Sequence, residues 1–161
     1  MALEWGNFFI AAAGASAALG GFIIVAVSVS VDRMIAIPGM TSRAAAAIAL
    51  LVLVAVVSLV SLIPHQPLLA LGAETAVLGL GVVAFATDSF VRLLGRDSGN
   101  TVGQALVKGG IGLVPAVSFV VGGVLTATGS VAGLGFVAAG TVLALIVSVV
   151  NAWVVLVEIR R

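Results

Sequence analysis

Five long apolar runs separated by short polar breaks dominate the chain. They cover roughly residues 8–31, 43–63, 68–91, 104–128 and 131–157. Each run is long enough for a transmembrane helix, which needs about 20 mainly apolar residues. The first three breaks contain VDRMIAIPGMTSR, PHQP and LLGRDSGNTVGQ, with the charges, prolines and glycines that are typical of turns. The pattern predicts an all-α membrane protein, a bundle of five transmembrane helices in a single domain that spans residues 1–161.

The fourth break, TATGS, carries no charge and is the least marked of the four. Residues 104–157 are nevertheless too many for one span, and their length suits a tight helical hairpin. A four-span arrangement would require one run to lie in the membrane interface. None of the runs has the strongly charged face that an interfacial helix needs.

Composition agrees with this class of protein and excludes several others. Hydrophobic residues make up 62% of the chain and charged residues 8%, whereas a soluble domain carries about 25% charged residues. The lack of cysteine rules out disulfides and thiolate metal sites, and a single histidine cannot make a multi-histidine metal site. No nucleophile–base pair or phosphate-binding loop is recognisable, so we expect neither an enzyme nor a cofactor. A net charge of +1 argues against a nucleic-acid partner.

The positions of the basic residues predict the orientation of the bundle. With five spans, every lysine and arginine falls on the same side: Arg33, Arg43, Arg92, Arg96, Lys108, Arg160 and Arg161. Cytoplasmic loops carry an excess of these residues. We therefore expect the N-terminus outside and the C-terminus in the cytoplasm.

Small residues recur at the spacing that lets membrane helices approach closely. This spacing occurs as Gly14–Ala18 in the first run and Gly72–Ala76 in the third. It is compatible with packing inside one bundle and with a contact between copies of the chain. In the fourth run, Pro115 frees the carbonyl of Ile111 and should kink the helix, as a static packing feature or as a hinge.

Glu74 is an acid in the middle of an apolar, glycine-spaced run. It lies seven residues after Pro67, which places it about 10 Å below the predicted outer boundary. A charge at the bilayer centre costs about 2.5–3.5 kcal/mol on insertion scales, and somewhat less at this depth. We therefore expect Glu74 to face the bundle or a pore, with Ser16 and Thr141 at a similar depth as partners. It is either a contact for an ion, proton or substrate, or a structural hydrogen-bonding acid.

A second polar layer is predicted near the cytoplasmic side. Asp88 and Arg92 are four residues apart on the third run, Lys108 begins the fourth, and Asn151 lies near the end of the fifth. Asp88 can pair with Lys108 across the connecting loop or with Arg92 on its own helix. Charges at helix ends often reach to the interface for structural reasons alone. Three serines, Ser28, Ser30 and Ser148, can bond the backbone of their own helices.

The segments FFIAAAGASAALGGFIIVAVSVSVDR and IPGMTSRA resemble a group of small bacterial multi-pass membrane proteins. Some members are described as modulators of the membrane protease FtsH, and the resemblance covers roughly residues 8–80. It implies a location in the bacterial cytoplasmic membrane and a regulatory role, and it assigns no role to any residue.

Two classes of function follow. The first is a channel or carrier for an ion or small solute, with Glu74 as an intramembrane polar contact. It should be a homo-oligomer, because one small bundle encloses little water-filled space. The second is a non-transporting module that binds or regulates another membrane protein, such as a membrane protease. Two polar layers around an apolar middle suit either a closed hydrophobic gate or a dry bundle.

Overall fold

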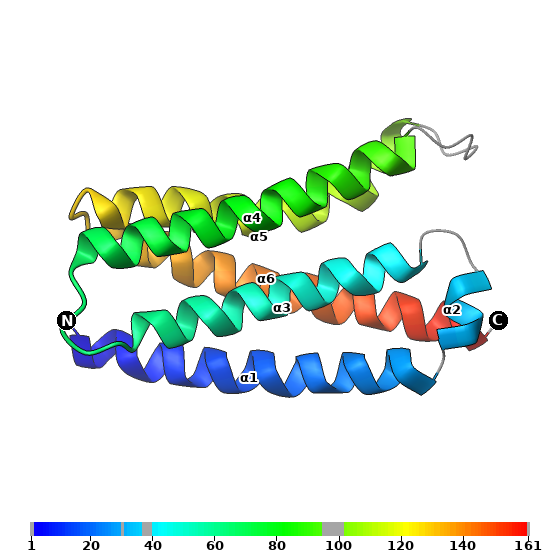
Figure 1. Ribbon diagram of the computed structural model, residues 1–161, viewed down its shortest axis with the longest axis horizontal. Helices are drawn as coiled ribbons and strands as arrows, with labels where there is room; N and C mark the ends of the chain where they lie inside the picture. Colours follow the sequence, from blue (N-terminus) through cyan, green and yellow to red (C-terminus); the bar gives the residue numbers. More distant parts are fainter. Residues whose placement is uncertain (1, 30, 37–39, 95–101, 161) are drawn as a thin grey trace.

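A computed structural model describes residues 2–29, 31–36, 40–94 and 102–160, and every regular element in them is helical. The helices are α1 (Ala2–Val29), α2 (Val31–Ala36), α3 (Met40–Ser61), α4 (Leu68–Leu94), α5 (Val102–Ala127) and α6 (Ala132–Arg160). The five long helices lie side by side along one axis, with the two chain ends at opposite ends of the bundle (Figure 1). They cover the five predicted runs, and only the short α2 was not expected.

Length and composition support a membrane-embedded bundle. Within the described residues, α1, α3, α4 and α6 each contain a stretch of at least 21 residues that is apolar enough to cross a membrane. The corresponding apolar part of α5, Gly112–Ala127, is shorter. The prediction of an all-α, multi-pass membrane protein is therefore supported, whereas the direction in which the bundle crosses the membrane stays a prediction.

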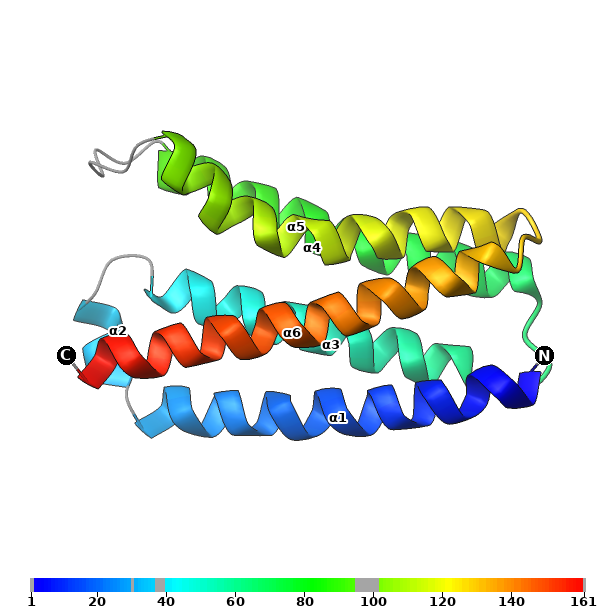
Figure 2. The ribbon, with the colours of Figure 1, turned by 180° about the vertical axis from the view of Figure 1, so that it is seen from behind.

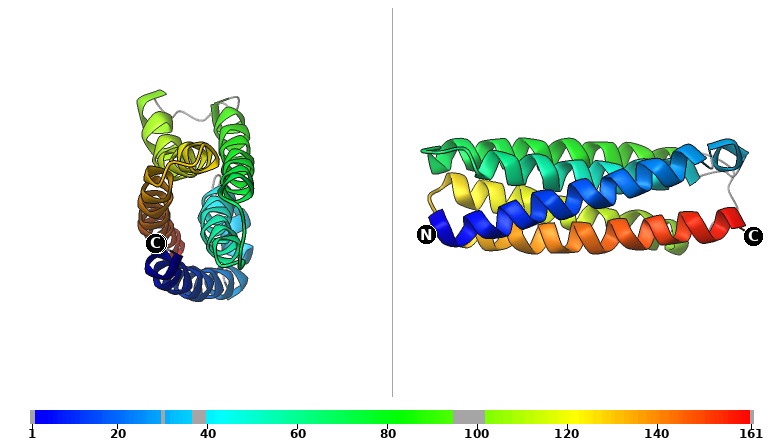
Figure 3. Two further views of the ribbon diagram at one scale, coloured as in Figure 1. Left: turned by 90° about the vertical axis from the view of Figure 1, so that its left-hand side faces the viewer. Right: turned by 90° about the horizontal axis from the view of Figure 1, so that it is seen from below.

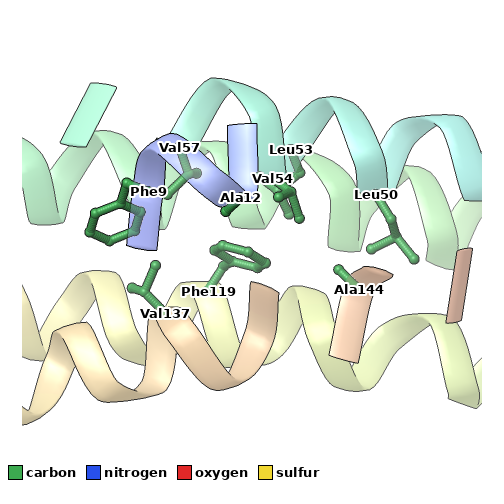
Figure 4. Packing of buried hydrophobic residues seen from close by; sticks show 9 residues of the cluster. All are labelled: Phe9, Ala12, Leu50, Leu53, Val54, Val57, Phe119, Val137 and Ala144. Carbon is green, nitrogen blue, oxygen red and sulfur yellow. The ribbon is translucent and has the colours of Figure 1, made fainter. Parts of the chain in front are cut away.

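The third helix is the centre of the bundle. It packs against α1, α4 and α6, and it is the helix with the largest buried share among the candidate spans. Its residues Val54 and Val57 meet Phe9 of α1, Phe119 of α5 and Val137 of α6 in the main hydrophobic cluster (Figure 4). The interior of the single chain is thus filled mainly with apolar side chains, together with a few buried hydroxyls such as Ser58 and Thr141.

Backbone-to-backbone contact holds α4, α5 and α6 together in one half of the bundle. A Cβ atom placed on Gly72 would collide with the backbone of Ala127, and one placed on Gly123 would lie 2.5 Å from the nitrogen of Ala76. Gly133 of α6 similarly has no room for a Cβ atom beside Thr126. The Gly72–Ala76 pair therefore packs inside one chain, against the equivalent spacing of Gly123 and Ala127 on α5.

At the end of the bundle that carries the C-terminus, α4 and α5 separate from the other helices. Figure 2 shows the green ends of α4 and α5 diverging from α3 and α6 on the side that carries the C-terminus. Pro115 is buried within α5, and the helix continues through it from Val102 to Ala127. The proline is thus accommodated within one helix, and its role as a hinge stays a prediction.

Candidate functional site

The surroundings of Glu74 are set by the connection between α3 and α4. The chain reverses there through His65, which has a left-handed φ of 59° and lies between Pro64 and the Gln66–Pro67 pair. From this connection the Gln66 side chain reaches α4, where its Nε2 donates a hydrogen bond of 2.5 Å to Oε2 of Glu74. The acid is therefore held by an amide donor from the adjoining turn, a partner that the sequence did not suggest.

Glu74 is exposed on the outside of the single bundle. Of the two surroundings expected for it, the interior of the bundle is excluded, and a pore stays a prediction. The reason is the helical period. Gly72, Thr75 and Gly79 are buried, because only small side chains fit where α4 meets α5. Glu74 is two residues beyond Gly72, about 200° around the helix, and it points away from that contact.

The two hydroxyl partners expected for Glu74 do not reach it. Ser16 of α1 is buried, and its Oγ donates to the carbonyl of Ala13 at 3.0 Å. Thr141 of α6 is also buried, and its Oγ1 has no hydrogen-bond partner in the part of the chain that the structure describes. The neighbours of α4 are α5 and α3, so helix packing keeps both hydroxyls away from Glu74.

A second acid lies on the same outward face of α4. Glu74, Val77, Gly81, Ala84 and Asp88 are all exposed, and their spacing of three or four residues aligns them along one side of the helix. We call these five residues the acidic stripe. Its two carboxylates are fourteen residues, about 21 Å, apart. Asp88 closes the apolar span Leu68–Asp88, and Glu74 lies about 9 Å inside its other end.

The middle of the stripe is small and open. Gly81 has no atom within 4 Å of the position that a Cβ would occupy, and Ala84 is exposed. The seven-residue spacing of Glu74, Gly81 and Asp88 is visible in the sequence and could have revealed the stripe. The sequence does not show which side of α4 packs against α5. That packing leaves the side with the acidic stripe exposed.

The rest of the predicted inner layer is only partly described. Asp88 is exposed, whereas the side chains of Arg92 and Lys108 lie outside the described residues, so both ion pairs stay predictions. Asn151 is half-buried on α6, whose main packing partners are α5, α3 and α1. Helix packing thus places Asn151 apart from the acidic stripe.

The serines divide between two kinds of hydrogen bond. Ser28 donates to the carbonyl of Ile24 on its own helix, as expected. The buried Ser148 of α6 instead donates to the carbonyl of Ala47 on α3, at 3.2 Å. That bond joins two helices, so Ser148 does not use the carbonyl of its own helix that the sequence made possible. Ser30 lies outside the described residues.

No protein-family model, curated protein or solved structure matches the chain. The resemblance to modulators of FtsH therefore rests on the sequence segments alone.

Proposed function

We propose that the protein forms a homo-oligomer in the bacterial cytoplasmic membrane and conducts a cation or small cationic solute along the acidic stripe of α4. The observation that carries the proposal is the pair of acids on one outward face of a helix that can cross the membrane. An acid that faces hydrocarbon costs up to about 2.5–3.5 kcal/mol near the bilayer centre. Further copies of the chain, with water between them, remove that cost.

The arrangement of the stripe suits a cation path. In an oligomer, Glu74 and Asp88 would form two rings of carboxylates, the side-chain type that lines cation channels. Between them, Val77, Gly81 and Ala84 would form an apolar zone, of the kind that gates a pore by losing water. The core of the single bundle is filled by residues such as Val54 and Phe119, so the path is expected between copies and not within one.

The substitution Glu74→Gln tests the proposal, because it keeps the shape of the side chain and removes the ionisable group. In protein reconstituted into vesicles, cation flux should fall by at least about tenfold. The attraction between a cation and one carboxylate at about 4 Å in a partly desolvated site exceeds the 1.4 kcal/mol that a tenfold change represents. Asp32→Asn is the matched control, because Asp32 is exposed on α2, away from the stripe.

Unchanged size and pH profile of the flux in Glu74→Gln would contradict the role of Glu74 and leave it a structural partner of Gln66. Failure of the unsubstituted protein to conduct any cation would contradict transport as a whole.

One observation favours the second class of function, a module that binds another membrane protein. Along α1, Gly14, Gly20 and Gly21 have nothing within 4 Å of a Cβ position. Glycine weakens a helix by about 1 kcal/mol relative to alanine, and here no contact inside the chain compensates. A helix of another protein packed on this face would use the space. Such a module would stay monomeric in bilayers and would conduct nothing.

A further inference from the structure

An apolar groove runs along the bundle at the end that carries the C-terminus. Its floor is formed by Ala44 and Ala47 of α3, and its walls include Phe22 and Ile23 of α1 and Ala152 and Trp153 of α6. All of its lining residues are hydrophobic, and its volume is about 230 Å³. The groove is separate from the acidic stripe, since α4 contributes no residue to it.

The groove exists because α1 and α6 both pack on α3 and touch each other little. Figure 3 (right) shows α1 and α6 crossing near the N-terminus and diverging toward the C-terminus. The small floor residues Ala44 and Ala47 leave the resulting space unfilled. Across the floor, Ser148 of α6 donates its hydrogen bond to the carbonyl of Ala47 and fixes the spacing of α3 and α6 there.

The size of the groove selects its occupant. A helix with its side chains is about 10–12 Å across and rises about 5.4 Å per turn. Even one turn therefore has a larger volume than the 230 Å³ of the groove. An apolar cavity of about 150 Å³ accepts benzene, so this groove can hold the end of a flexible acyl chain. Because its walls belong to candidate membrane spans, phospholipid is the molecule that surrounds it.

The charge at this end of the bundle selects the headgroup. The beginning of α3 and the ends of α4 and α6 lie at this end (Figure 1), and it is the side to which the sequence prediction assigns the excess of Lys and Arg. Arg43 lies one turn before Ala47 on the same side of α3. It is half-buried and forms no salt bridge with any residue that the structure describes. Asp32 on α2 and Asp88 on α4 are exposed acids toward the same end.

We propose that this groove is a binding site for an anionic phospholipid, with one acyl chain between α1 and α6 and the phosphate beside Arg43. Basic pockets between membrane helices on the cytoplasmic side bind anionic headgroups in this way. Arg43 then gains an anion that no described residue of the chain supplies. The site is independent of any transport by the acidic stripe.

Trp153 is an internal reporter, because it lines the groove and the chain has only one other tryptophan, Trp5. The experiment uses the Trp5→Phe protein in phosphatidylcholine vesicles that contain a small fraction of brominated phosphatidylglycerol or of brominated phosphatidylcholine. Bromine quenches tryptophan on contact. We expect the anionic lipid to quench Trp153 more than the neutral lipid does at the same mole fraction.

Matched variants locate the site. Arg43→Gln should lower the preference for the anionic lipid about fivefold, the effect of one cation at a membrane surface, whereas Arg43→Lys and Arg96→Gln should keep most of it. Ala26→Leu narrows the groove from α1 and should also reduce the preference. Ala139→Leu, an exposed position of α6 outside the groove, should not.

Equal quenching by the two lipids at every fraction would overturn the proposal, because it would show only general contact with the bilayer. An absence of quenching by either lipid would also overturn it, by showing that protein covers the groove.

Discussion

At the scale of single residues, the glycines of the bundle divide into two groups. Gly72, Gly123 and Gly133 stand where a neighbouring backbone occupies the place of a Cβ atom, whereas Gly14 and Gly135 have nothing within 4 Å. Close approach of backbones supplies packing that hydrophobicity cannot give in lipid. The first group therefore holds the bundle together, and the second leaves surface free.

The pair Gly133 and Gly135 tests this division within one helix. Gly133→Ala should destabilise the protein by about 1–3 kcal/mol, because the added methyl overpacks the contact with Thr126. Gly135→Ala should be neutral or stabilising, since alanine favours a helix by up to about 1 kcal/mol where space is free. Unfolding of both variants in detergent measures the difference. Equal stability of the two variants would contradict a close backbone contact between α5 and α6 at Gly133.

The sequence pattern singles out Glu74 as an unusual acid, but it does not determine the side of α4 on which Glu74 lies. The close packing of Gly72–Ala76 follows from spacing, whereas the depth of Glu74 in a membrane stays a prediction. Which side of α4 meets a neighbour depends on contacts with residues of α5 that are forty or more positions away in sequence. For this reason Ser16 and Thr141 were expected as partners of Glu74 facing the bundle or a pore, whereas its partner is Gln66 in the adjacent turn.

At the scale of elements, hydrophobic run length was sufficient to predict the five long helices, because a membrane span has a minimum length. The short α2 was not predictable in the same way. Six residues do not form a stable helix alone, and α2 depends on the burial of Met34 against Met40 and Ala44 of α3. Tertiary contacts with α3, and not the local sequence pattern, therefore stabilise α2.

The α4–α5 hairpin provides a prediction for the inner layer. Antiparallel contact pairs Gly72 with Ala127 and Gly79 with Val120, and the same register continued along both helices brings Asp88 within about one turn of Lys108. We expect an ion pair between them. In a double-mutant cycle on unfolding free energy, Asp88→Asn and Lys108→Gln should show a coupling of about 0.5–1 kcal/mol. A coupling indistinguishable from zero for this pair, with a measurable one for Asp88 and Arg92, would place the bond on one helix.

At the scale of the whole molecule, the proposed homo-oligomer would give the acids of α4 an aqueous surrounding. Its interior is closed by the cluster around Phe119 and Val54, whereas both acids of the α4 span lie outside it. Copies arranged head-to-tail in a closed ring would turn the acidic stripe toward a common axis. The number of copies is set by contacts between chains, which neither the sequence pattern nor one chain's packing determines.

Thiol accessibility along α4 tests the central claim, that the acidic stripe faces water. The chain has no cysteine, so Val77→Cys and Ala84→Cys each introduce one thiol. Controls at similar depth are Val142→Cys and Ile146→Cys, on the exposed apolar side of α6. A membrane-impermeant thiol reagent is applied to each side of the reconstituted protein. Because the thiolate is the reactive form and apolar surroundings suppress it, the two α4 cysteines should react at least about tenfold faster than the α6 controls. Reaction as slow as the controls at both α4 positions would show that the stripe faces lipid and would contradict an aqueous path along α4.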